Sequence, residues 1–389
     1  MTRITTLDLH GIVRIRLEDA TTADAAVIAR QLGPLPEVSD TTPDLTIRFV
    51  DRLVTRGRVR YLGHEDAGFT DDAYLVLRGR HKSSVRVQVP ITRIGTGPSE
   101  IVCERGVTAV PLLVPMIALT ALSRDVLPVH GSAFVHDDRG VLVVGWAKGG
   151  KSETLLAFAT AGASYVGDEW IFIDVPTQRM YGLPEPMRIW DWQLRSLPGL
   201  AQAVSPGARR RLAVTRSSIS GLRGVERIPI MGRKAPGKVA RRVRAILEQQ
   251  QSVQVPTEQL LGAGPLDDGW SLDRLILVVS HDAPMIDVQP IDARTVAARA
   301  TASLLFEFGD LLGHYRRARF AFPESVNPAL EGLEATVSAA MDQALGGQSA
   351  LMVAHPYPVE IASLRTAIAP HLTTPGGPSV ISEAVTGGG

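Results

Sequence analysis

One segment of the chain combines residue types at a spacing that could bind phosphate. It completes the pattern G-x-x-x-x-G-K-[ST] and is called here the glycine-rich loop, residues 145–152. In such a loop the backbone N–H groups wrap around the phosphates of a nucleotide, because glycine allows the tight curvature that an anion requires. The predicted binding residues are Gly145, Trp146, Ala147, Lys148, Gly149, Gly150, Lys151, Ser152 and the following Glu153.

The chemistry expected of this loop is the binding of ATP and Mg²⁺. Lys151 can reach the β- and γ-phosphates, and the Ser152 hydroxyl can ligate Mg²⁺. The apolar residues 141–144 predict a buried strand before the loop, and residues 152–161 predict a helix whose N-terminus faces the phosphates. The alternative is a glycine-rich turn that binds nothing, but strand, loop and helix stand in the order that phosphate binding requires.

Two adjacent acids follow the loop after one predicted helix and a turn. Asp168 and Glu169 interrupt an apolar stretch, and Asp168 stands 17 residues after Lys151, so both acids should return toward the loop. We expect Glu169 to assist Ser152 in holding the metal, while Asp168 orients an acceptor hydroxyl or takes its proton. Paired acids in a turn are otherwise usually solvated.

A histidine opens the hairpin that leads into the loop. His130 is followed by Gly131 and Ser132. Two apolar stretches within residues 129–144 flank a turn at residues 137–140. A lone histidine at such a position is more often structural than catalytic.

Taken together, residues 129–133, the glycine-rich loop with Glu153, and residues 167–169 resemble the catalytic core of the HPr kinase/phosphorylase family. That core is itself similar to the nucleotide site of ATP-dependent phosphoenolpyruvate carboxykinases. The resemblance covers residues 128–174. It implies a mixed sheet with the phosphate-binding loop at one edge, bound Mg-ATP, and transfer of phosphate to a hydroxyl.

The resemblance also implies roles for single residues. Lys151 and Ser152 match the phosphate and metal contacts of the family, Asp168 matches the acid that acts on the acceptor hydroxyl, and His130 matches a histidine beside that acid. The chain departs from the family at Glu169, where a second aspartate is usual. This departure favours a divergent kinase of the same fold.

Composition places the chain among ordinary globular proteins. Of its 389 residues 45% are hydrophobic and 21% are charged, and a single cysteine, Cys103, excludes an intramolecular disulfide. The N-terminus has no apolar segment typical of a signal peptide, so we expect a cytoplasmic protein. The apolar residues 107–122 contain two prolines and are too short to cross a membrane, so we expect a buried helix and no membrane partner.

The predicted fold class is α/β, with an HPr-kinase-like phosphate-loop core on a mixed sheet. We expect a small α+β module of unknown role over residues 1–105, the kinase-like domain over 106–372, and a disordered tail over 373–389. Strands are predicted at 6–9, 45–50, 73–77, 84–89, 164–166, 170–173 and 272–280, and helices at 23–32, 107–124, 293–312 and 328–345.

Residues 207–244 carry twelve Lys and Arg against one acid, Glu226. This basic stretch could close over an anionic substrate, could bind nucleic acid, or could be a solvated loop. Nucleic acid is disfavoured because residues 207–244 contain no Phe, Tyr or Trp. Arg188 is a further candidate contact with substrate.

The sequence therefore predicts an Mg-ATP-dependent kinase that phosphorylates a hydroxyl of a small molecule or peptide. An anionic acceptor and a homo-oligomer are both compatible with the sequence. Two alternatives remain open. One is a protein serine kinase/phosphorylase of the HPr type, and the other is an ATP-binding sensor or scaffold without catalysis.

Overall fold

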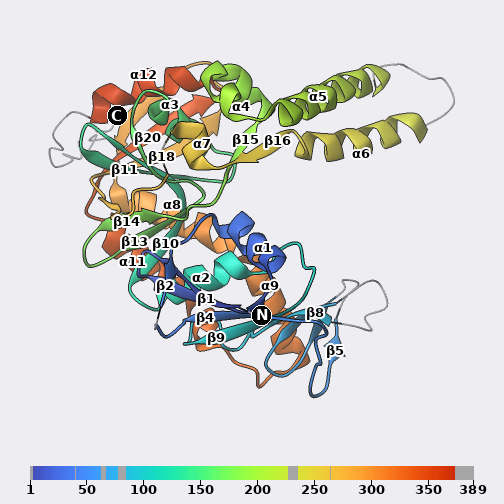
Figure 1. Ribbon diagram of the computed structural model, residues 1–389. Coiled ribbons are helices and arrows are strands. Elements are labelled where there is room, and N and C mark those ends of the chain that lie inside the picture. The colour runs from blue at the N-terminus through green and yellow to red at the C-terminus, as the bar shows by residue number, and fades with distance from the viewer. Residues whose placement is uncertain are drawn as a thin grey trace, which may run out of the picture. The chain divides into compact units, whose positions relative to one another are not determined.

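A computed structural model describes residues 3–39, 41–62, 67–77, 85–226, 235–262 and 264–372 of the chain. The protein is an α/β protein with two large mixed sheets, which confirms the predicted class (Figure 1). The tail predicted to be disordered, residues 373–389, lies outside the described residues.

The chain forms two compact units. The first unit comprises Met1–Pro184 with Pro265–Gly389 and holds both large sheets, and the second comprises Glu185–Gly264. The boundary at residue 105 stays a prediction of the sequence.

The first sheet is built from the N-terminal hundred residues. In the order β3-β1-β2-β4-β9-β8-β7-β6-β5, its described strands are β1 (Arg3–Leu9), β2 (Val13–Ala20), β3 (Glu37–Val38), β4 (Leu45–Val50), β5 (Arg60–Tyr61), β6 (Ala67–Phe69), β7 (Tyr74–Leu77), β8 (Val85–Val89) and β9 (Ser99–Glu104). Helix α1 (Thr22–Leu32) begins at a capping box formed by Thr21 and Asp24. The predicted strands and helix of this segment are confirmed over the described residues, whereas β2, β3, β5, β6 and β9 were not predicted.

The second sheet carries the glycine-rich loop. Its order is β17-β14-β13-β10-β11-β18-β20-β19, and β12 pairs with β10 beside this path. The described strands are β10 (Val126–His136), β11 (Arg139–Gly145), β12 (Ser164–Gly167), β13 (Trp170–Asp174), β14 (Arg179–Gly182), β17 (Trp270–Ser271), β18 (Arg274–His281), β19 (Asp287–Ile291) and β20 (Ser349–Pro356). The predicted hairpin is confirmed, because β10 and β11 pair antiparallel from Gly131↔Val144 to His136↔Arg139.

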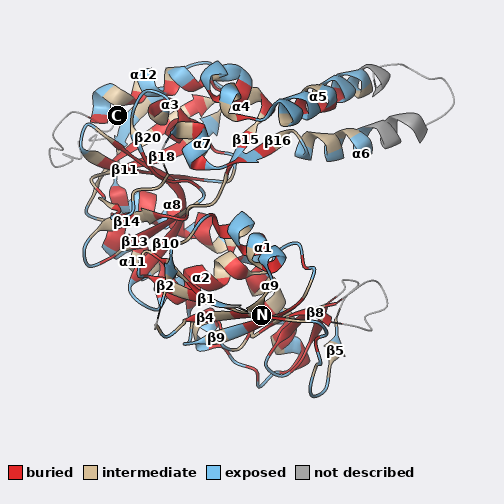
Figure 2. Cartoon of the chain, viewed as in Figure 1, coloured by how far each residue is buried: buried red, intermediate tan, exposed pale blue. Residues whose placement is uncertain are grey.

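The strand that leads into the loop is interior in this sheet. Strand β11 pairs parallel with β18 on one side and antiparallel with β10 on the other. Strand β18 in turn pairs parallel with β20. The resemblance implied an edge position, which the strand order contradicts. The physical reason is burial, since all four apolar residues 141–144 are fully buried, as expected of a strand covered on both faces (Figure 2).

Helices cover both faces of the second sheet. They are α2 (Leu113–Leu122), α3 (Lys151–Ala159), α8 (Ala293–Glu307), α11 (Leu333–Leu345) and α12 (Ile361–Leu372). Helices α9 (Gly309–Ala321) and α10 (Pro328–Glu331) instead contact the N-terminal segment, where His314 of α9 stacks on Tyr74 of β7 and Asn327, before α10, donates to the Ile91 and Ile94 carbonyl oxygens. Helix α3 lies beside α12, and α8 lies beside α11 (Figure 1). Helix α2 contacts strands of both sheets, and one continuous apolar core includes residues from both. No helix in the described part of the chain is both long enough and apolar enough to span a bilayer.

Three predicted helices have different bounds. The helix expected at 293–312 is broken at Phe308, where α8 ends and α9 begins, and that expected at 328–345 is broken at Gly332. The helix expected at 107–124 begins only at Leu113. In each case apolar residues continue beyond the helix because the adjoining segment is also buried, so periodicity did not locate the end.

The second unit is inserted between two paired strands of the first. It consists of β15 (Met187–Trp190), α4 (Asp191–Ser196), the 3₁₀ helix η1 (Pro198–Ala203), α5 (Pro206–Glu226), α6 (Ala235–Gln249), β16 (Ser252–Val255) and α7 (Thr257–Leu261). Helices α5 and α6 lie side by side (Figure 1) and carry most of the basic stretch, which is therefore largely helical. The chain leaves after β14 and returns at β17, and these strands pair through Arg179↔Ser271 and Met180↔Trp270.

Candidate functional site

The glycine-rich loop connects β11 to α3 through a backbone that requires glycine. A Cβ atom at Gly145 would lie 2.6 Å from the Val278 carbonyl oxygen, and one at Gly149 would lie 2.9 Å from the Trp146 carbonyl oxygen. Gly150 has a φ of +107°, and a Cβ atom there would overlap the His355 ring. The glycines therefore allow close packing of the loop against β18 and β20.

Helix α3 begins directly after this loop. Gly150 is its N-cap, and no side chain of the described residues caps the helix. The first N–H groups of a helix have no partner within the helix, and together with the helix dipole they favour an anion at that end. The loop and the start of α3 thus fit a phosphate group.

Lys151 folds back over the loop. Its side chain is 7% exposed, and its Nζ donates to the carbonyl oxygens of Gly145 and Trp146, each at 3.2 Å. Burial lowers the pKa of Lys151, and nearby carboxylates, Glu169 first among them, oppose that shift. The ammonium group is therefore positioned at the start of the loop.

Asp168 and Ser152 are in direct contact. The Ser152 hydroxyl lies 3.0 Å from each carboxylate oxygen of Asp168 and donates to that carboxylate. The Asp168 side chain is 3% exposed, and burial together with the neighbouring charge of Glu169 raises its pKa to about 7. The predicted meeting of this acid with the glycine-rich loop is thus present in the structure.

Glu169 points to a different neighbour. It occupies the turn between β12 and β13 with a φ of +62°, and its Oε2 lies 3.0 Å from Nε2 of His130. Its carbonyl oxygen accepts a hydrogen bond from the Gly131 N–H at 3.1 Å. Adjacent acids therefore serve different parts of the site, Asp168 at α3 and Glu169 at β10.

His130 lies between two glutamates. Its Nδ1 is 3.0 Å from Oε1 of Glu307, at the end of α8, opposite the contact with Glu169. Burial opposes a charge on the ring, but the contacts with Glu169 and Glu307 outweigh burial, so the pKa of His130 is raised. The contact with His130 in turn lowers the pKa of Glu307. This arrangement favours an imidazolium held between two carboxylates.

The sequence placed His130 beside Asp168, and among the described residues no hydrogen bond or ion pair joins the two side chains. The ring nitrogens of His130 contact Glu169 and Glu307, and Asp168 instead accepts from Ser152. The reason is the turn between β12 and β13, which directs its two acids to different neighbours.

Four polar residues of the site were missed by the sequence. The Ser132 hydroxyl donates to the Lys151 carbonyl oxygen at 3.0 Å, and the Ser303 hydroxyl donates to the Gly145 carbonyl oxygen at 3.2 Å. His355, which is fully buried, has its Nε2 2.9 Å from the Gly149 carbonyl oxygen. Glu307 is the fourth. Ser132 follows His130 and Gly131 directly, so it alone of the four lies next to a predicted site residue in the sequence. Ser303, Glu307 and His355 are more than 130 positions beyond Glu169 along the chain.

A metal ion at this site would need additional ligands from a bound nucleotide. In the part of the chain that the structure describes, no group of three or more His, Cys, Asp or Glu side chains is arranged to hold a metal ion. Mg²⁺ usually binds through one or two protein ligands, water and substrate phosphates. Of the two predicted metal ligands, Ser152 contacts Asp168 and Glu169 contacts His130.

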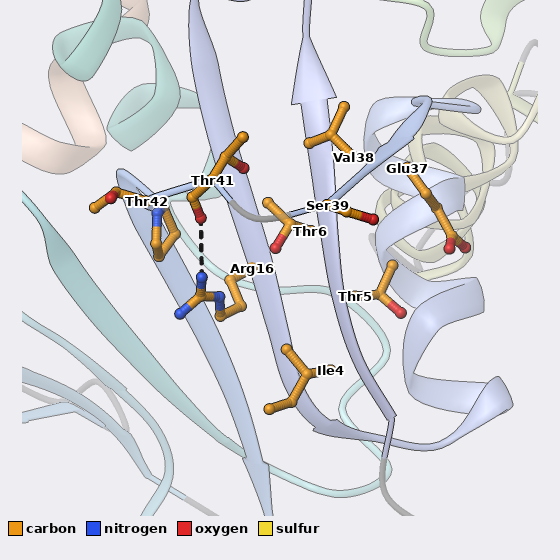
Figure 3. A pocket seen from close by; sticks show the side chains of 10 residues that line it. Ile4, Thr5, Thr6, Arg16, Glu37, Val38, Ser39, Thr41 and Thr42 are labelled. Atoms are coloured by element: carbon orange, nitrogen blue, oxygen red, sulfur yellow. Dashed lines mark hydrogen bonds between the residues drawn. The ribbon is translucent and has the colours of Figure 1, made fainter.

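A pocket of about 550 Å³ lies beside the glycine-rich loop. It is lined by residues 145–149, residues 277–280 of β18, and Arg299 and Ala302 of α8. A separate hollow of about 630 Å³ lies on the first sheet (Figure 3). There Arg16 donates to the Thr41 carbonyl oxygen at 3.0 Å, and none of the predicted site residues lines it.

The basic stretch forms ion pairs within its own unit. Arg216 is 2.8 Å from a carboxylate oxygen of Asp191, and Arg223 and Arg244 both contact Glu248, at 3.1 and 2.8 Å. The other candidate contact, Arg188, is exposed on β15. Part of the stretch, including residues 227–234, lies outside the described residues.

Comparison with protein-family models and with curated proteins found no match for this chain. The geometry of the site is therefore the basis for assigning a function.

Proposed function

We propose that the chain is an Mg-ATP-dependent phosphotransferase that transfers the γ-phosphate to a hydroxyl of a small molecule or peptide. The observation that carries the proposal is the contact between Ser152 of the glycine-rich loop and Asp168. It brings a loop suited to phosphate and a buried carboxylate into one site, and phosphoryl transfer requires both.

The glycine-rich loop and the start of α3 bind the phosphates in this proposal. Lys151 exchanges its hydrogen bonds with the two loop carbonyl groups for contacts with the β- and γ-phosphates. Ser152 and Glu169 hold Mg²⁺, which neutralises negative charge on the phosphates when it is bound. His130, held by Glu307, orients Glu169.

Asp168 acts on the acceptor. The hydroxyl oxygen forms a bond to the γ-phosphorus as the bond from that phosphorus to the β–γ bridging oxygen breaks, and ADP leaves with that electron pair. The hydroxyl proton passes to a carboxylate oxygen of Asp168. The Ser152 hydroxyl donates to this carboxylate, whose oxygens have further lone pairs that can take the proton.

The test is a transfer assay on the full chain with Mg-ATP labelled on the γ-phosphate. The acceptors are a pool of small alcohols and a pool of Ser- and Thr-containing peptides, with HPr as a separate sample. We expect label in one of the first two pools, and label in HPr alone would assign the HPr-type kinase instead. Tight Mg-ATP binding without turnover on any acceptor would contradict the kinase and support a sensor.

Two variants sharpen this test. Asp168→Asn should bind Mg-ATP with unchanged affinity and lose about 10²–10⁴-fold in transfer rate, because the proton acceptor is gone. Asp282→Asn, at an exposed aspartate after β18, is the matched control and should transfer at the wild-type rate. Full transfer by Asp168→Asn would show that another group takes the proton.

A further inference from the structure

The pocket beside the glycine-rich loop has one wall made by the loop itself. Residues 145–149 line it on one side, and the end of β18 and the outer face of α8 line the other. Its volume of about 550 Å³ lies within the range of about 300–1,000 Å³ found for small-molecule sites. A ligand held by the loop would therefore lie next to this pocket.

An exposed aromatic pair stands at this place. Trp146 of the loop is 52% exposed and Phe306 of α8 is 57% exposed, and their ring centroids are 4.8 Å apart. Ala302 lies one turn before Phe306 on α8 and lines the same pocket, so little side-chain bulk fills the space beside Trp146. The indole face is thus a platform on which a flat ring could stack.

The sheet register leaves backbone groups facing this space. Strand β11 ends at Gly145, which is level with Val278, but β18 continues to His281. Val279 and Ser280 therefore pair with β20 on one side and have no partner from β11 on the other. Successive strand residues point their backbone groups to alternate sides, and the Val278 carbonyl oxygen faces Gly145 of β11, so it is the N–H and C=O of Ser280 that face the unpaired side and can bond the edge of a heterocycle.

The order of strands separates the pocket from the two acids. Asp168 and Glu169 lie in the connection between β12 and β13, and both of these strands pair with β10 on one side of β11. The pocket is on the other side, at β18. A triphosphate whose γ-phosphate faces Asp168 therefore extends its nucleoside toward β18.

We propose that this pocket is the binding site of the nucleobase, called here the nucleobase seat. This inference rests on the proposed binding of ATP by the glycine-rich loop. The base stacks on Trp146 and bonds the free edge of β18. Arg299 makes no recorded ion pair among the described residues, and its planar guanidinium lines the same pocket, where it covers the base or bonds a ribose hydroxyl.

The test compares two ligands on the full chain, Mg-ATP and Mg-bound inorganic tripolyphosphate, by titration calorimetry. Tripolyphosphate has the phosphates without the base, so it reports on the loop alone. Trp146→Ala should weaken Mg-ATP binding by about tenfold or more, as the loss of one aromatic stacking partner predicts, and leave tripolyphosphate binding within about twofold. Ala302→Trp, which fills the pocket from α8 without altering the loop, should do the same.

The matched control is Phe320→Ala, which removes an aromatic side chain that is 78% exposed on α9 and does not line the pocket. This variant should bind both ligands as the wild type does. Equal weakening of both ligands by Trp146→Ala, or unchanged Mg-ATP binding in Ala302→Trp, would overturn the nucleobase seat and leave the phosphate site standing. Wild-type protein that binds neither ligand would overturn the proposed function as well.

A different occupant would show itself in the same variants. If Mg-ATP affinity is unchanged while the KM for the acceptor rises, the pocket holds the acceptor rather than the base. That result would also overturn the nucleobase seat.

Discussion

Replacing Asp168 by Asn should make the protein more stable at neutral pH although it removes the proposed proton acceptor. The Asp168 carboxyl is buried next to Glu169, and its pKa is raised from the ordinary 3.8 to about 7. Between these two values the folded protein retains a proton that the unfolded chain releases. Its free energy of unfolding therefore falls as pH rises through this window, and the loss is complete above about pH 7.

The size of the effect follows from the shift. A difference of about three pKa units, at ~1.4 kcal/mol each, corresponds to about 4 kcal/mol at most. Asn carries no charge, so the free energy of unfolding of the variant does not fall in this pH window. Lys151 opposes the shift of Asp168 and would lose a compensating carboxylate, and one of the two contacts with Ser152 would be weakened. We therefore expect Asp168→Asn to gain about 1–3 kcal/mol near pH 8 and nothing near pH 4.

The assay is urea unfolding followed by circular dichroism near pH 4 and near pH 8, with chelator present and nucleotide absent. The measured quantity is the difference in free energy of unfolding between variant and wild type at each pH. Asp282→Asn, at an exposed position, controls for the loss of one negative charge and should show no difference at either pH. An Asp168→Asn variant whose advantage does not grow with pH would refute the buried-carboxyl reasoning.

Three further outcomes are expected. Lys151→Ala should abolish ATP turnover and keep the circular dichroism spectrum of the wild type, and turnover within tenfold of wild type would contradict the role of the ammonium group. Gly150→Ala should cost about 2–4 kcal/mol in urea unfolding, because its φ of +107° and the His355 ring both oppose a Cβ atom. Gly221→Ala within α5, where a Cβ meets nothing within 4 Å, should instead stabilise by about 0.5–1 kcal/mol, because alanine favours a helix interior over glycine. Burial raises the pKa of Cys103 to about 12, so a thiol reagent near pH 8 should label it only after unfolding, and rapid labelling of the native protein would show that the thiol is accessible.

The parts of the site that the sequence predicted are close together in the chain. The hairpin, the glycine-rich loop, α3 and the two acids all fall within residues 128–174, so a short stretch of residue types and spacings was enough to bring Asp168 to Ser152. The direction of each acid was not predictable, because it depends on the conformation of Glu169, whose positive φ no sequence pattern required.

The parts that were missed depend on pairing between distant segments. His355 reaches the loop because β18 and β20 add parallel to β11, with long connections that residue patterns do not specify. Ser303 reaches it because α8 packs against β11 and β18. Glu307 depends on the end of α8 at Phe308. The only local indication of that end is Gly309, and a single glycine is tolerated within a helical pattern.

The paired strands β14 and β17 have a consequence for how this chain could be re-engineered. Because they are neighbours in the ladder, with Met180 opposite Trp270, the two ends of the 185–264 insertion leave the sheet from adjacent positions. A short linker can join such ends, since loop closure then demands little span. Excision of the insertion, or its replacement by another domain, would therefore keep both large sheets and the β14–β17 pairing within one chain.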